Sequence, residues 1–153
     1  MREIKFRGKR EDNGEWAYGS LVNNMFKTPS IIDTNLFENY DSWEDIDLLV
    51  ADVDLETVGQ YTGLKDRNGK DIYEGDIIEN YFSKRDDFCY EVIWYQETGQ
   101  WMFDPFMKGD SDAPLLGIEE FIQDWDTVGF DDGTVEVIGN IHSNPELLGG
   151  TGA

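Results

Sequence analysis

The chain has 153 residues and a formal net charge of −21, with 33 Asp and Glu against 12 Lys and Arg. A chain of this length can bury a real core, as one domain or as two small subdomains. The negative charge repels phosphate backbones and anionic lipid, so we expect neither nucleic acid nor a membrane as a partner.

One cysteine, Cys89, excludes an intrachain disulfide and a multi-cysteine metal site. No apolar run reaches the ~20 residues of a membrane span, and the charged N-terminus lacks the pattern of a secretory signal. We therefore expect a cytoplasmic protein. A nucleophile pair of Cys89 and His142 would also need an orienting group and oxyanion donors, of which the sequence gives no sign.

Residues 4–21 predict a β-hairpin. Apolar and polar residues alternate on both sides of Asn13-Gly14, a pair that suits tight turns with positive φ. The first ten residues carry the single acid Glu3 and five cations, Arg2, Lys5, Arg7, Lys9 and Arg10. These cations either contact an anion or a partner, or pair with acidic residues of neighbouring strands, and we favour the second interpretation.

An acidic, irregular region follows, with one short strand expected at Ile31–Ile32. Between Thr28 and Leu64 the chain has no Lys or Arg, and its nine acids are Asp33, Glu38, Asp41, Glu44, Asp45, Asp47, Asp52, Asp54 and Glu56. The calcium loop of an EF-hand requires a glycine that is absent after Asp52-Val53-Asp54. We expect a solvated acidic loop; the alternative is an acidic face over 33–56 that mimics DNA phosphates and occupies a basic host protein.

The segment 59–79 is dense in turn and strand signals, and it follows predicted strands at 48–53 and 57–62. Asn68-Gly69 predicts a second tight turn, and Gly75 permits a tight backbone before the next strand. Such a turn feeding a Gly-Asp strand is frequent in small SH3-like barrels. The sequence therefore predicts a mainly β fold, with small SH3-like barrel subdomains built from hairpins.

The second half of the chain continues the hairpin pattern. Residues 88–95 and 100–103 predict a hairpin around Gly99. Apolar residues at helical spacing predict the one short α-helix, near 114–125, with acidic residues in its first turns.

A fourth hairpin is expected over 127–142, followed by a helical turn at 144–148 and a flexible tail at 149–153. We expect a single domain over 1–148, with a division into two β subdomains at about 1–87 and 88–148 as the alternative.

The order of these motifs resembles the phage YopX family. The residues that carry the resemblance are Ile4 to Lys9 with Trp16 to Leu21, Val58 to Asp66, Ile72 to Ile78, and Val137 to His142 with Asn144 to Leu147. The resemblance implies a small β-rich protein encoded by phages and prophages of bacteria, without an established activity. It supplies no catalytic residue.

No residue pattern in the chain requires a reaction, so we assign no catalytic residue, no metal ligand and no cofactor. We expect a non-enzymatic binding or assembly protein of the infected bacterial cytoplasm, either a homo-oligomer or a binder of a basic host or phage protein. The alternative is a small metal- or nucleotide-dependent enzyme that uses turn carboxylates such as Asp66, Asp71, Glu74 and Asp76. The candidate binding residues are Lys65, Asp66, Arg67, Lys70, Tyr61, Tyr73 and Asp76.

Overall fold

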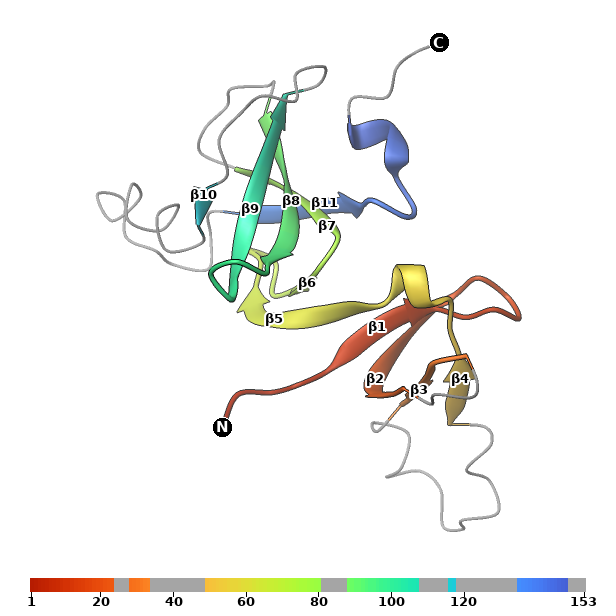
Figure 1. The fold of residues 1–153 in the computed structure, drawn as a ribbon. Coiled ribbons are helices and arrows are strands. Elements are labelled where there is room, and N and C mark those ends of the chain that lie inside the picture. Colours follow the sequence, from red (N-terminus) through yellow and green to blue (C-terminus); the bar gives the residue numbers. More distant parts are fainter. Residues whose placement is uncertain (24–27, 34–48, 81–87, 108–115, 118–134, 149–153) are drawn as a thin grey trace. The chain divides into compact units, whose positions relative to one another are not determined.

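The computed structural model describes residues 1–23, 28–33, 49–80, 88–107, 116–117 and 135–148, and Figure 1 shows their arrangement. Strands dominate these residues, which confirms the mainly β prediction. The chain divides into two compact units, Met1–Gly63 and Leu64–Ala153. The sequence placed its alternative division near residue 87, but the strands on either side of that point pair with each other in one sheet.

The first unit holds a curled sheet in which the first four strands follow one another in order and β5 returns to pair with β1. Its strand order is β4-β3-β2-β1-β5. The bounds are β1 Phe6–Lys9, β2 Trp16–Val22, β3 Ser30–Ile32, β4 Val50–Asp52 and β5 Gly59–Lys65. β5 runs on into the second unit, where its next neighbour is β6, Asp71–Tyr73. A single turn of 3₁₀ helix, Leu55–Thr57, precedes β5, with the carboxylate of Asp54 accepting a hydrogen bond from the backbone N–H of Glu56 at 3.0 Å.

The predicted first hairpin is confirmed, with Phe6 opposite Gly19 and Lys9 opposite Trp16. The predicted short strand at Ile31–Ile32 lies within β3. Alternate residues of these strands face a small core of Ile31, Ala51 and Val53. Phe6, Ala17, Leu21 and Val58 are packed against it.

The second unit is built on a five-stranded antiparallel sheet with the order β10-β9-β8-β7-β11. The bounds are β7 Asp76–Asn80, β8 Phe88–Tyr95, β9 Gln100–Met107, β10 Leu116–Gly117 and β11 Val135–Asn140. β8 and β9 form the predicted hairpin around Gly99, from Phe88 opposite Met107 to Tyr95 opposite Gln100. A second 3₁₀ turn, Pro145–Leu148, confirms the helical turn expected there.

The core of this unit lies between strands that are distant in sequence. Its buried members are Ile72, Ile78, Val92, Trp101, Phe103, Val135 and Val137. Trp101 is 8% exposed and contacts the 40%-exposed Trp94 edge-on, with ring centroids 5.0 Å apart. This core contains Ile72 and Ile78 of the 59–79 segment and Val137 of the C-terminal motif, so packing joins these two sequence motifs.

The predicted helix near 114–125 is wrong at the two residues of that range that the structure describes. Leu116 and Gly117 form β10, which pairs with Phe103 and Met102 of β9. Hydrogen bonding to β9 here takes precedence over the helical spacing of the apolar residues, a weak local signal. The rest of that range, most of the acidic region at 34–48, the first strand of the fourth hairpin at 127–130 and the tail at 149–153 lie outside the described residues.

Candidate binding site

Asp66 is a buried structural clamp. Its side chain is 1% exposed, and its Oδ1 accepts hydrogen bonds from the backbone N–H groups of Asn68 and Lys70 at 2.8 and 2.9 Å. Its Oδ2 accepts a third, at 3.1 Å, from the backbone N–H of Val137 in β11. Asp66, a candidate binding residue from the sequence, therefore lies away from the surface, because its carboxylate turns inward to satisfy backbone donors of its own turn and of a remote strand.

Asp76 has a similar role in the next turn. It is 1% exposed, and its Oδ2 accepts a hydrogen bond from the backbone N–H of Tyr73 at 2.8 Å. Between them Gly75 has φ +78, a left-handed conformation that costs other residues free energy. The Gly75 N–H donates to the carbonyl of Val92, and its own carbonyl accepts from the N–H of Ile141. The Gly-Asp pair thus fixes backbone geometry.

The other candidate residues differ in solvent exposure: the two tyrosines are buried and the cations are exposed or half-buried. Tyr61, in the first unit, and Tyr73, in the second, are each 4% exposed. Lys65 and Lys70 are exposed at the turn, and Arg67 is half-buried. Lys65 forms a salt bridge with Asp71, and Arg67 lies 4.0 Å from a carboxylate oxygen of Glu136. The turn therefore presents cations, but acidic neighbours balance much of their charge.

The basic strand β1 stacks its cations on aromatic rings. The Lys5 ammonium lies 4.5 Å from the centre of the Tyr61 ring, and the Arg7 guanidinium 4.7 Å from that of Trp16. Lys9 approaches the same Trp16 ring at 5.6 Å. Contacts of this kind stabilise a cation without a carboxylate. The two sequence interpretations, contact with an anion or partner and pairing with acidic residues, did not include these rings, because the register that places Trp16 and Tyr61 beside these cations is not visible in the chain.

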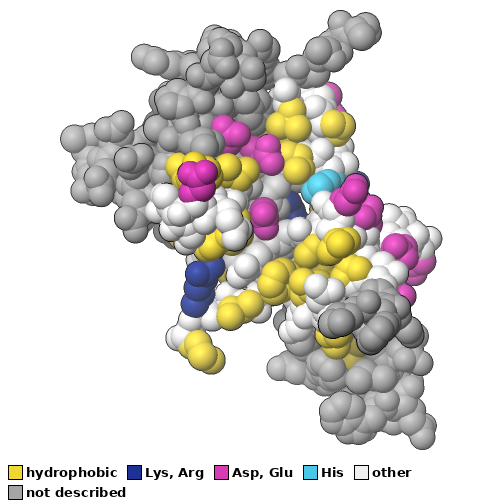
Figure 2. All heavy atoms as spheres, in the orientation of Figure 1, with side chains coloured by type: hydrophobic (Ala, Val, Ile, Leu, Met, Phe, Trp, Pro, Cys, Tyr) yellow, Lys and Arg dark blue, Asp and Glu magenta, His cyan; other side chains and the backbone are white. Residues whose placement is uncertain are grey.

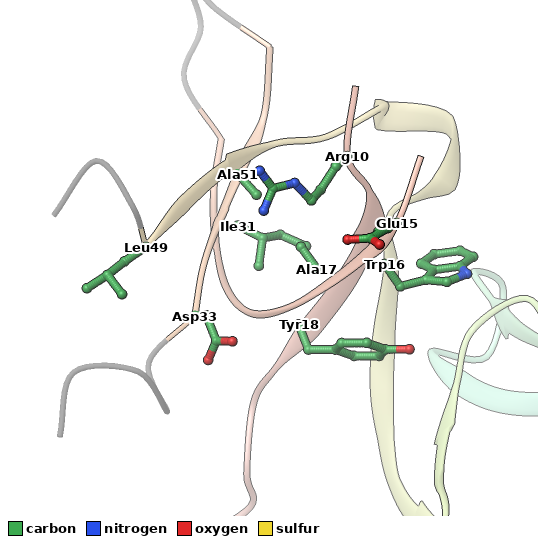
Figure 3. A pocket seen from close by; sticks show the side chains of 9 residues that line it. All are labelled: Arg10, Glu15, Trp16, Ala17, Tyr18, Ile31, Asp33, Leu49 and Ala51. Atoms are coloured by element: carbon green, nitrogen blue, oxygen red, sulfur yellow. The ribbon is translucent and has the colours of Figure 1, made fainter. Parts of the chain in front are cut away.

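A pocket of about 140 Å³ opens on the core-side face of the first sheet, and we call it the β2–β4 pocket (Figure 3). Its lining residues are Arg10, Glu15, Trp16, Ala17, Tyr18, Ile31, Asp33, Leu49 and Ala51. Ile31, Leu49 and Ala51 are buried and make its base apolar. Figure 3 shows the Arg10 guanidinium and the carboxylates of Glu15 and Asp33 around the side chains of Ile31 and Ala17.

Strand periodicity explains this arrangement. Ile31 lies opposite Leu21 of β2 and Ala51 of β4, so these residues share a face of the sheet. Asp33 lies two residues beyond Ile31, and Glu15 two residues before Ala17, so each carboxylate continues an apolar row at its end. Asp33 begins the acidic region 33–56 considered from the sequence, whereas Glu15 was not a candidate. Side chains alternate between the two faces of a strand, and following this alternation one step past each strand end would have placed both carboxylates beside the apolar row.

The charge of Arg10 is already balanced. Its Nε and one terminal nitrogen donate to the two carboxylate oxygens of Asp12 at 2.9 and 2.7 Å, a two-pronged contact. This contact lowers the pKa of Asp12 and raises the pKa of Arg10, so both groups stay ionised. The carboxylates of Glu15 and Asp33 are the other charged groups of the lining, and Glu15 accepts a hydrogen bond from the side-chain amide of Asn13 at 3.2 Å.

Two carboxylates in the second unit face each other across strands. Glu91 of β8 lies opposite Asp104 of β9. Burial raises the pKa of Glu91, and the nearby charges of Asp104 and Glu74 raise it further. Burial also raises the pKa of Asp104. Within the described ranges, no group of three or more His, Cys, Asp or Glu residues has the arrangement of a metal site.

Comparisons with known proteins agree with the resemblance of the sequence. A protein-family model described as YopX protein matches residues 5–149. The crystal structure of protein EF1440 from Enterococcus faecalis is similar in fold, with a TM-score of 0.51 and 24% sequence identity over 97% of this chain and 99% of that chain. No curated protein matches the chain. In the part of the chain that the structure describes, no helix has the length and apolar character needed to cross a bilayer.

Proposed function

The chain belongs to the YopX family, and from this premise we propose that it is a non-enzymatic binding protein whose partner is a basic protein. As the family resemblance implies, the chain is encoded by a phage or prophage and acts in the cytoplasm of the bacterial host. Its partner is then a basic protein of the host or of the phage itself.

The role of Asp66 is the observation that carries the proposal. A buried carboxylate that already accepts three backbone hydrogen bonds has little capacity left for a metal ion or a substrate proton. Asp76 is also buried, and Asp71 is paired with Lys65. The enzyme alternative depends on these carboxylates, so their structural roles favour binding over catalysis.

The charge of the chain supports a basic partner. A net charge of −21 attracts cationic surfaces and accelerates their encounter. Figure 2 shows acidic side chains at several separate places on the face that it draws. Charge spread in this way steers a basic protein toward the molecule.

A capture experiment tests the proposal. Tagged protein is expressed in a bacterial host carrying the phage, crosslinked in cells, and its partners are identified by mass spectrometry. An unrelated folded protein of equal net charge is the control bait. We expect one basic protein to be enriched by this chain alone, crosslinked through its Lys side chains, and released when salt rises from about 0.1 M to about 0.5 M.

Two results would contradict the proposal: equal enrichment by the control bait, or a partner that is acidic and unaffected by salt. Light scattering on a sizing column distinguishes the homo-oligomer. A defined dimer or larger assembly of the purified chain, with no captured basic protein, would replace a foreign partner with a second copy of the chain.

A further inference from the structure

The chain carries the dipeptide Asn-Gly at two exposed turns, Asn13-Gly14 and Asn68-Gly69. Asparagine is a thermolabile residue, and it is most labile before glycine, which has no side chain to obstruct its own backbone nitrogen. That nitrogen attacks the side-chain carbonyl carbon of the asparagine, and a succinimide ring closes. Water then opens the ring to aspartate or isoaspartate. The two turns are therefore candidate sites of spontaneous deamidation.

The two glycines present the attacking nitrogen in the same way. Gly14 has φ +72 and Gly69 has φ +78. The N–H of Gly14 donates to the carbonyl of Arg10 at 2.9 Å, and the N–H of Gly69 donates to the carbonyl of Asp66 at 2.9 Å. A Cβ atom added to either glycine would meet no atom of the described residues within 4 Å. A difference in reactivity must therefore come from the asparagine side chains.

The side-chain amide of Asn13 is held at both of its polar atoms. Its Oδ1 accepts a hydrogen bond from the backbone N–H of Glu15 at 2.9 Å. Its Nδ2 donates to the carboxylate of Glu15 at 3.2 Å. Such a local turn contact fixes the rotation of the amide. Both bonds must break before the amide can rotate to form the ring and lose its nitrogen.

The side-chain amide of Asn68 is not held in this way. The backbone N–H of Asn68 donates to Oδ1 of Asp66 at 2.8 Å, but its side-chain amide forms no hydrogen bond with the residues that the structure describes. The side chain lies at an exposed turn and can rotate toward Gly69 without breaking a contact. The two dipeptides thus differ in the anchoring of the amide.

From this contrast we infer that Asn68 is a site of spontaneous deamidation in the folded chain, whereas the contacts with Glu15 protect Asn13. The nitrogen of Gly69 gives its proton to a base of the solvent and forms a bond to the side-chain carbonyl carbon of Asn68. The amide nitrogen of Asn68 leaves as ammonia, and one water molecule opens the ring. Water enters and ammonia leaves, without an oxidant or a reductant. The inference does not depend on the proposed function.

The isoaspartate product would disturb the clamp of Asp66. Its main chain runs through the former side chain, which adds a methylene group before the nitrogen of Gly69. In the unmodified turn, the N–H of Gly69 donates to the carbonyl of Asp66, and the N–H of Lys70 donates to its Oδ1 at 2.9 Å. The longer backbone displaces both donors, and the new carboxylate repels that of Asp66. Because Asp66 also holds Val137, the reaction loosens β11.

Mass spectrometry on the full chain tests the site. Folded protein is incubated in mildly alkaline buffer and then cleaved with chymotrypsin. Cleavage after Leu64 and Tyr73 isolates one dipeptide, and cleavage after Phe6 and Trp16 isolates the other. The replacement of NH₂ by OH is followed over time, and isoaspartate is detected with protein-isoaspartate methyltransferase.

We expect Asn68 to react about tenfold faster than Asn13 in the folded chain, as the loss of two modest hydrogen bonds predicts. In urea the two should react at similar rates, because both turns are lost. Equal rates in the folded chain, or faster reaction at Asn13, would overturn the inference. So would an intact Asn68 in the folded chain after the chain in urea has reacted fully.

Two variants test the causes. Glu15→Ala removes the carboxylate that accepts from Asn13, at an exposed position, and should speed the reaction of Asn13 while leaving that of Asn68 unchanged. An unchanged rate at Asn13 would refute the protection by Glu15. Asn68→Gln keeps an amide but would have to close a larger ring, which forms far more slowly. During incubation the Tm of the parent chain should fall while that of Asn68→Gln stays constant. Equal falls would show that the reaction does not loosen the clamp.

Discussion

The carboxylate of Asp66 accepts a hydrogen bond from the backbone N–H of Val137, 71 residues further along the chain. This bond connects the two parts of the sequence that carry the family resemblance within the second unit. A side chain in a turn thereby fixes the register of a remote strand. Several residues of the 59–79 segment satisfy backbone groups that neighbouring strands leave without partners. This role explains why turn-forming and polar residues are so frequent in that segment.

Replacement of Asp66 by Ala should destabilise the chain strongly. The change leaves three backbone N–H groups without their acceptor, at about 1–3 kcal/mol for each buried donor that water cannot reach. We expect a loss of about 3–5 kcal/mol in the free energy of unfolding, measured by urea denaturation. Lys70→Ala, at an exposed position of the same turn, is the control and should change the free energy by less than about 0.5 kcal/mol. Equal losses would show that the clamp is not what stabilises the turn.

Gly139 should tolerate no side chain, for a reason of space. A Cβ atom added there would lie 2.6 Å from the Asn144 side-chain oxygen and 2.8 Å from a methyl carbon of Leu147. We expect Gly139→Ala to cost about 1–3 kcal/mol in thermal or urea unfolding. Asn144→Ala removes one of the two obstacles, so the double variant should lose less than the sum of the single losses. Additive losses would contradict this close approach.

The opposed carboxylates Glu91 and Asp104 predict a dependence of stability on pH. The folded state raises the pKa of Glu91, so it favours the protonated form, and stability falls as pH rises from the ordinary glutamate pKa of about 4.3 through the raised value. Glu91→Gln should therefore raise the Tm at pH 7, and the gain should vanish toward pH 4. Calorimetry across this range measures it, with the exposed Glu56→Gln as control. A gain independent of pH would contradict the assignment.

Trp101 is a large buried side chain whose indole N–H is a hydrogen-bond donor. Its indole N–H is buried and has no hydrogen-bond partner among the residues that the structure describes, although the ring packs in the core of the second unit. Trp101→Ala should cost about 3–5 kcal/mol because it leaves a large cavity. Trp101→Phe should cost less than half of that, since it also removes an unsatisfied donor. Chemical denaturation of both variants measures the difference, and similar losses would show that the N–H has a partner in solution.

Local signals made much of the fold predictable. The Asn-Gly turns, the alternating runs around Gly99 and the Gly-Asp pair each specify a backbone conformation within a few residues, and the hairpins follow from them. The helix near 114–125 was mispredicted at Leu116 and Gly117 because spacing alone does not reveal a pairing strand.

The candidate site was less predictable because it depends on register. Asp66 was a candidate binding residue from the sequence, and its burial and its bond to the remote Val137 N–H show its structural role. Glu15 precedes β2 and Asp33 follows β3, and they line one pocket because of the way in which β2, β3 and β4 pair. Such long-range pairing leaves no mark in a single sequence.

The position of β11 in its sheet constrains the order in which the second unit can form during synthesis. β11 pairs with β7, and Val135 faces Asn80 at one end of that ladder. The ribosome must therefore release the chain through β11 before β7, which can already pair with β8, gains its second neighbour and Asp66 its last donor, since contacts of large sequence separation close late. Until then one edge of β7 stays open to chaperones and proteases, and a chain that terminates before Val135 never pairs that edge with β11.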